Sequence, residues 1–128
     1  MLPKDAPTRQ KSHSTPKSLQ KAPLWDKQVV RHRLAVLATK VAAGRALVHE
    51  TAWRCVQKQD CTREVSMIKA YCAELANEVM YQCLQLHGGS GYMTGSTIER
   101  MARDARAHPI GGGATDVMYE EVAKRLGR

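Results

Sequence analysis

The distribution of proline limits what this chain can fold into. Four of its five prolines lie within the first 23 residues and the fifth is Pro109, so the 85 residues between Pro23 and Pro109 contain none. Proline removes a backbone donor and disrupts a helix interior, so a proline-free segment of this length permits long helices. The whole chain has 128 residues, which is enough for one domain with one modest core.

The apolar residues favour helices over strands. They make up 43% of the chain, but aromatic residues are only 5% and phenylalanine is absent. A core must therefore be built from leucine, valine, alanine and methionine, a set that suits packed helices better than a sheet.

Apolar residues recur at alternating intervals of four and three, which predicts one long helix over about 26–57 and another over about 62–86. The first stripe comprises Val30, Leu34, Leu37, Val41, Gly44, Val48, Thr51 and Cys55. The second comprises Val65, Ile68, Cys72, Leu75, Val79 and Leu86, with a further apolar strip of Ala73, Ala76, Met80 and Leu84. Two apolar strips predict that the second helix lies between neighbours, and the short connection predicts that the two helices are antiparallel.

Two glycine-rich segments interrupt the rest of the chain. The first glycine turn (residues 87–95) reads HGGSGYMTG and the second (residues 111–113) is Gly-Gly-Gly. Short helices are predicted over about 97–107 and 115–126, the last burying Met118, Val122 and Leu126. No strand precedes the first turn and its glycines lack the G-x-G-x-x-G spacing, which excludes a Rossmann site. The second turn precedes a helix, so free backbone N–H groups of Ala114, Thr115 and Asp116 would suit an anion.

Charge and composition separate residues 1–24 from the rest. This segment holds four prolines and half of the net charge of +8, and it predicts a disordered basic tail ahead of a four-helix domain at 25–128. Because the domain itself is only mildly basic, nucleic-acid binding is disfavoured. No apolar run is long enough to span a membrane. The cysteines at 55, 61, 72 and 83 lack zinc-site spacing and are interpreted as reduced thiols, with no metal site expected.

The order of these segments resembles the C-terminal helical domain of the acyl-CoA dehydrogenases. The resemblance runs from about Trp25 to Arg128 and is carried by QLHGGSGY (85–92), RMARDAR (100–106) and PIGGGATDVM (109–118). It implies an all-α, up-and-down helical bundle covering about the last third of a family chain. These flavoenzymes use FAD to oxidise an acyl-CoA thioester to the trans-2-enoyl-CoA, with a carboxylate removing the α proton.

The resemblance also implies site residues. The first glycine turn is expected to hold the adenine end of the FAD of a neighbouring subunit, and the second to lie beside the thioester and the flavin. The implied FAD contacts are Gln85, Leu86, His87, Gly88, Gly89, Ala114, Thr115 and Asp116, and the implied substrate neighbours are Gly112 and Gly113.

Departures from the family pattern bear on catalysis. Many members carry the catalytic glutamate where this chain has Gly112, and a branch with glycine there supplies the base from an earlier helix; residues 1–24 contain no glutamate. The arginine and Phe-Gly expected shortly before Gln28 are missing, and the usual threonine after the glycine pair is Ala114. No catalytic residue is therefore assigned, and we expect a domain or fragment that is inactive alone.

Two other functions remain open at this point. One is a noncatalytic helical module that self-associates through exposed apolar strips, and the other is a basic-tailed nucleic-acid binder. The family interpretation implies acyl-CoA as substrate once missing domains complete the site, and a homo-oligomer or a complementing subunit as partner. It places the protein in the cytoplasm, or in the mitochondrial matrix if the organism is a eukaryote.

Overall fold

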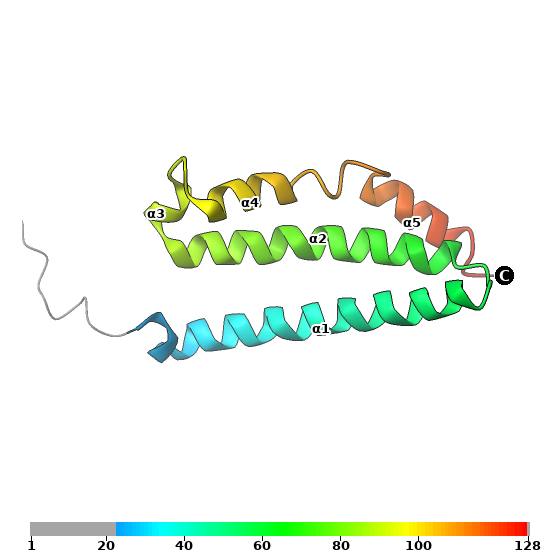
Figure 1. Ribbon diagram of the computed structural model, residues 1–128, viewed down its shortest axis with the longest axis horizontal. Coiled ribbons are helices and arrows are strands. Elements are labelled where there is room, and N and C mark those ends of the chain that lie inside the picture. The colour runs from blue at the N-terminus through cyan, green and yellow to red at the C-terminus, as the bar shows by residue number, and fades with distance from the viewer. Residues whose placement is uncertain (1–22, 128) are drawn as a thin grey trace, which may run out of the picture.

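The computed structural model describes residues 23–127, in which helices are joined by short connections and no strand occurs (Figure 1). The predicted all-α fold is confirmed. Apart from its last two residues, the predicted tail lies outside the described residues. In chain order the elements are η2 (Leu24–Asp26), α1 (Gln28–Val56), α2 (Thr62–His87), α3 (Gly89–Tyr92), α4 (Thr97–Ala105) and α5 (Thr115–Ala123).

Helix α2 is the centre of the arrangement. It runs antiparallel to α1 on one side, while α4 and α5 follow one another along its opposite side (Figure 1). The prediction that α2 lies between neighbours is confirmed, because Leu75 from the first strip and Ala73 from the second are both buried. The Asn77 side chain ties α2 to the end of α4 by donating to the carbonyl of Ala105 at 3.0 Å.

Helix α1 has fewer neighbours, contacting only α2 and η2 among the described elements. Its buried residues are Val30, Leu37, Gly44 and Thr51, each seven residues from the next. The rest of the predicted α1 stripe is less buried, since Leu34 is half-buried and Val41, Val48 and Cys55 are exposed. A single neighbouring helix covers only a narrow line of residues, so the remainder of an apolar stripe faces outward.

The connection between α1 and α2 reverses the chain tightly. Gln59 donates its N–H to the carbonyl of Arg54 at 3.2 Å, and Lys58 donates to Cys55 at 3.0 Å. This pair of bonds, with Lys58 in the left-handed region at φ 59°, is a Schellman motif. It returns the chain so that Cys61, buried just before α2, lies against the last turns of α1.

We expect Thr51→Val to raise the free energy of unfolding by up to about 1 kcal/mol. Thr51 is 3% exposed, and its hydroxyl is the one buried side-chain polar atom in residues 23–127 without a hydrogen-bond partner. Valine has nearly the same shape and removes the desolvated hydroxyl. Urea unfolding would measure the gain. The control is Thr39→Val, because the exposed Thr39 hydroxyl donates to the Ala35 carbonyl at 2.8 Å and valine forfeits that bond. A Thr51→Val protein no more stable than the parent would contradict the expectation.

The C-terminal half differs from expectation in two places. Residues within the first glycine turn form the one-turn helix α3, where only a loop was predicted. Helix α5 ends at Ala123, so Leu126 is exposed rather than buried, while Met118 and Val122 are half-buried against α2 as expected. Leu126 lies beyond the last helical turn that α2 supports.

Candidate functional site

The first glycine turn closes the C-terminal end of α2. Gly88 is the C-cap of α2 at φ 60° and ψ −150°, a conformation open almost only to glycine, and it also begins α3. The Ser90 hydroxyl donates to the His87 carbonyl at 2.7 Å. The ring of His87 lies 2.8 Å from the Cys83 carbonyl through Nδ1. Because a carbonyl can only accept, this contact assigns the proton to Nδ1 and leaves Nε2 facing outward as an acceptor when the ring is neutral.

The predicted FAD contacts of this turn lie on its outer surface. Gln85, His87, Gly88 and Gly89 are exposed, and Leu86 is half-buried. A Cβ atom added at Gly88 or Gly89 would meet nothing within 4 Å, so the backbone there is open to a ligand from outside the chain. Gly91 differs, since a Cβ there would come within 2.7 Å of the Cβ of His87. Gly88 and Gly89 are therefore accessible, and the absence of a side chain at Gly91 allows α3 to pack on α2.

The second glycine turn is held against the middle of α2 by two side chains. Lys69 donates its ammonium group to the carbonyl of His108, just before the turn. Glu74 accepts a hydrogen bond from the hydroxyl of Thr115 at 2.9 Å, just after it. Both anchors come from α2, and they fix where the turn and the start of α5 lie. The sequence offered no signal for either residue, since each is an ordinary charged residue of a long helix.

The predicted set of free amides before α5 needs a correction. The N–H of Thr115 is not free, because it donates to the carbonyl of Pro109 at 3.1 Å and closes the loop. The carboxylate of Glu74 already lies at the N-terminus of α5, where the helix dipole favours negative charge. Any interaction of this turn with an outside anion would rest on the amides of Ala114 and Asp116.

Gly112 and Gly113 have φ values of 67° and 108°, in the left-handed region. Gly112 is exposed, and a Cβ added there would lie 3.9 Å from the Cε atom of Lys69. A glutamate at Gly112 would have to adopt a conformation that costs an L-residue about 1–2 kcal/mol. The backbone at Gly112 therefore suits glycine in this chain.

The two turns do not form one site within the chain. Thirteen residues of α2 separate Glu74 from His87, which corresponds to a rise of about 20 Å. Figure 1 shows the same separation, with α3 at one end of α2 and α5 near the other. A ligand held by the first turn would thus be a different molecule, or a distant part of the same one, from a ligand beside the second turn.

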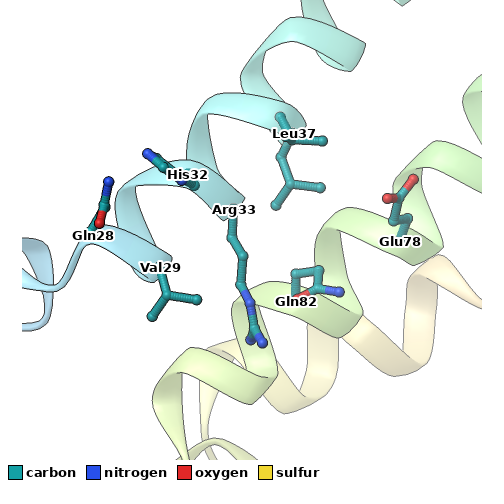
Figure 2. Close-up of a pocket in the computed structure, with 8 residues that line it drawn as sticks. Gln28, Val29, His32, Arg33, Leu37, Glu78 and Gln82 are labelled. Carbon is teal, nitrogen blue, oxygen red and sulfur yellow. The ribbon is translucent and has the colours of Figure 1, made fainter.

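Two grooves lie alongside α2. One, of about 450 Å³, opens where the N-terminal half of α1 diverges from α2 (Figure 2). In it Arg33 extends from α1 toward α2, near Gln82. The other, of about 540 Å³, separates α2 from the segment that precedes the second turn and includes Lys69, Cys72 and His108. Neither groove is lined by a predicted FAD contact.

The described residues fit FAD only as one wall of a site. Accessible glycine backbone and an outward imidazole nitrogen at the first turn suit a ligand that approaches from outside. The two grooves alongside α2 do not include those groups, and no cluster of three metal-ligating side chains occurs in residues 23–127. Within the same residues, no helix has both the length and the hydropathy needed to cross a bilayer. The first glycine turn therefore presents exposed backbone to a ligand that approaches from outside the chain.

Comparison with known proteins agrees with this arrangement. The family model for the C-terminal domain of acyl-CoA dehydrogenases matches residues 12–127. The chain therefore belongs to the acyl-CoA dehydrogenase family and corresponds to its C-terminal helical domain. The match begins within the segment 1–24, ahead of the described residues.

The relatives that this chain matches are much longer than the chain itself. Mitochondrial long-chain specific acyl-CoA dehydrogenase of Rattus norvegicus is 41% identical over 103 residues, which cover 77% of this chain and 23% of that protein. Subunit CarC of the caffeyl-CoA reductase-Etf complex of Acetobacterium woodii is 38% identical over 101 residues, covering 79% and 27%. A solved structure of a probable acyl-CoA dehydrogenase from Mycobacterium abscessus superposes with a TM-score of 0.80 at 37% identity, covering 84% of this chain and 29% of that one. The chain thus spans about a quarter of the relatives' length.

Proposed function

We propose that this chain provides the C-terminal helical wall of an FAD-dependent acyl-CoA dehydrogenase and has no dehydrogenase activity by itself. The observation that carries the proposal is the pair of glycine turns, each with exposed backbone and neither enclosed by the chain's own residues. The first turn would contact the FAD of a neighbouring subunit through Gln85, Leu86, His87, Gly88 and Gly89. The second would lie beside the thioester at Gly112 and Gly113, with Ala114, Thr115 and Asp116 near the flavin.

The family reaction needs a base, a positioned thioester and a bound flavin that accepts the hydride. The described residues offer backbone contacts for the thioester and the flavin. At the position expected for the base they have a glycine. The partners that complete the site would carry the remaining three quarters of the relatives' length, and acyl-CoA would bind only to the completed assembly. The compartment would then be that of the full enzyme, which is mitochondrial for the rat relative.

Complementation tests the proposal. The rat long-chain relative, truncated before the region that this chain matches, would be mixed with the purified 128-residue chain, FAD and a long-chain acyl-CoA. We expect no reduction of an electron-acceptor dye by the chain alone, and FAD retention through gel filtration only when both proteins are present. A chain that alone stays yellow and reduces the dye would contradict its inactivity. A chain that fails to associate with the truncated enzyme would contradict the assignment as its missing wall.

In that assembly, Gly89→Val is expected to weaken FAD retention at least about tenfold, equivalent to about 1.4 kcal/mol. The added Cβ meets nothing within 4 Å in this chain, so we expect no clash with the fold, but the side chain occupies the surface through which a ligand would reach the backbone. Gly127→Val is the matched control, because a Cβ there also meets nothing within 4 Å and the residue lies away from both turns. FAD titration followed by fluorescence would measure both. Equal affinities would show that the first turn does not contact FAD.

Self-association is a second candidate, favoured by exposed apolar side chains of α1. Val29, Val36, Trp53 and Val56 on this helix are each more than half exposed. Burying such side chains would favour an oligomer. Sedimentation of the chain with and without FAD separates the candidates, because a noncatalytic module would form the same oligomer in both and would ignore the truncated enzyme.

A further inference from the structure

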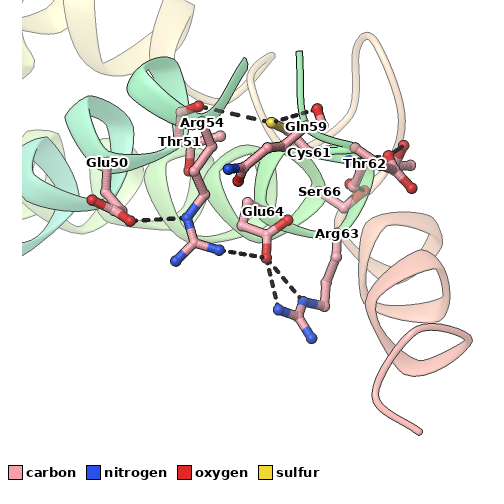
Figure 3. A network of polar contacts seen from close by, with 10 residues as sticks. Glu50, Thr51, Arg54, Gln59, Cys61, Thr62, Arg63, Glu64 and Ser66 are labelled. Carbon is pink, nitrogen blue, oxygen red and sulfur yellow. Dashed lines mark hydrogen bonds and ion pairs between the residues drawn. The ribbon is translucent and has the colours of Figure 1, made fainter. Parts of the chain in front are cut away.

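The end of the α1–α2 hairpin brings two cysteines from different helices together. Cys55 belongs to the last turn of α1, and Cys61 is the residue immediately before α2. The Schellman turn between them folds the chain back, so the Cys61 sulfur lies 3.9 Å from the carbonyl oxygen of Thr51 and 3.2 Å from that of Gln59 (Figure 3).

The sulfur of Cys55 converges on the same place. Thr51 and Cys55 are four residues apart on one face of α1, and a helical side chain leans over the turn that precedes it. Cys55 therefore lies above the Thr51 carbonyl that the Cys61 sulfur approaches from the other side. The Cys55 thiol is close enough to raise the pKa of Cys61.

The two thiols differ in access and in reactivity. Cys55 is exposed, whereas Cys61 is only 6% exposed. Interaction with the Cys55 thiol, burial, and the nearby carboxylates of Glu64 and Asp60 raise the pKa of Cys61 to about 11. Since the thiolate is the reactive form, Cys61 in the resting protein is a poor first nucleophile. An oxidant from solution therefore meets Cys55 first.

We propose that Cys55 and Cys61 form a reversible redox modification site that takes a small-molecule disulfide, such as oxidised glutathione, as its oxidant. The Cys55 thiolate attacks one sulfur of that disulfide, whose S–S bond breaks and releases one glutathione, which takes up a proton. Cys61 then loses its proton and attacks the Cys55 sulfur, and the second glutathione leaves. Two protein thiols are oxidised by two electrons to one disulfide, and the oxidant is reduced to two thiols.

The other cysteines cannot form an equivalent pair. Cys72 and Cys83 lie eleven residues apart in α2, a rise of about 16 Å that no disulfide spans. The same rise separates Cys61 from Cys72. A disulfide at the hairpin end would tie α1 covalently to α2, the one long helix against which α1 packs among the described residues. The inference is independent of the proposed function, since it involves neither glycine turn.

Peptide mapping tests the proposal on the full 128-residue chain. The folded protein would be incubated with oxidised glutathione, blocked with N-ethylmaleimide and digested with trypsin without reduction. Cleavage after Arg54, Lys58 and Arg63 places Cys55 on peptide 55–58 and Cys61 on peptide 59–63, whereas Cys72 and Cys83 share peptide 70–100. We expect the linked pair 55–58/59–63 to be the main oxidised product, and reduced glutathione in excess to reverse it.

Variants separate the two steps. Cys61→Ser should leave glutathione attached to Cys55, because nothing displaces it. Cys55→Ser should leave Cys61 unmodified in the folded chain and modified in urea, and Cys72→Ser should give the linked pair at the parent level. The proposal is overturned if glutathione remains on Cys55 in the parent as fully as in Cys61→Ser. It is equally overturned if the main product links two copies through Cys55, or if folded Cys55→Ser reacts at Cys61 as readily as in urea.

Discussion

Replacing Gly91 with alanine should lower the free energy of unfolding by about 2 kcal/mol. The added Cβ would lie 2.7 Å from the Cβ of His87 and 3.1 Å from the carbonyl oxygen of Leu84. Neither contact is the end of a flexible side chain, because a Cβ and a backbone oxygen are fixed to α2 itself. The clash can be relieved only by moving α3 away from α2, which disrupts the first glycine turn. Thermal unfolding followed by circular dichroism would measure the loss.

Gly89→Ala is the matched control for this substitution. Gly89 lies two residues earlier in the same one-turn helix, and its added Cβ would meet nothing within 4 Å. An alanine there should change the free energy of unfolding by no more than about 0.5 kcal/mol. If both variants melted alike, α3 would not be packed on α2 as described.

The second large effect is expected for Leu75→Ala, with a loss of about 3 kcal/mol. Leu75 is 9% exposed and lies in the middle of α2, where it faces Gly44 of α1. The absence of a side chain at Gly44 lets the helices approach closely, and Leu75 fills the space between them. Alanine would leave a cavity at the centre of the hairpin, because two long helices cannot collapse into it locally.

Urea unfolding of Leu75→Ala and Leu126→Ala would check this expectation. Leu126 is 68% exposed and lies beyond α5, so its truncation should cost less than about 0.5 kcal/mol. Equal losses in the two variants would mean that the contact between α1 and α2 contributes little to stability.

The long helices could be predicted from the sequence almost to the residue. The expected ranges 26–57 and 62–86 became Gln28–Val56 and Thr62–His87, since these helices are set by local periodicity and by the proline-free segment. Which apolar residues are buried could not be predicted as well. Val41 and Val48 repeat on the same stripe as Leu37 and Gly44, but burial depends on how many neighbours the chain itself supplies to α1.

The two glycine turns could be located from the sequence, but their geometry could not be predicted. The two glycine turns were found because glycine runs are visible in a sequence, and their left-handed backbone at Gly88, Gly112 and Gly113 bears out the need for glycine. The anchors Lys69 and Glu74 depend on how α2 meets later segments that lie about 40 residues away in sequence. Contacts between residues so far apart produce no periodic pattern in the amino-acid sequence.

The side-by-side arrangement of α1, α2 and the α4–α5 row makes the described chain a slab one helix thick (Figure 1). No large side chain in it is completely removed from solvent, because there is no second layer to cover either broad face. A single layer of helices has no enclosed interior of its own. Any ligand must therefore bind on one of its two broad faces or at one of the two glycine turns. These surfaces become buried only when other molecules cover both faces.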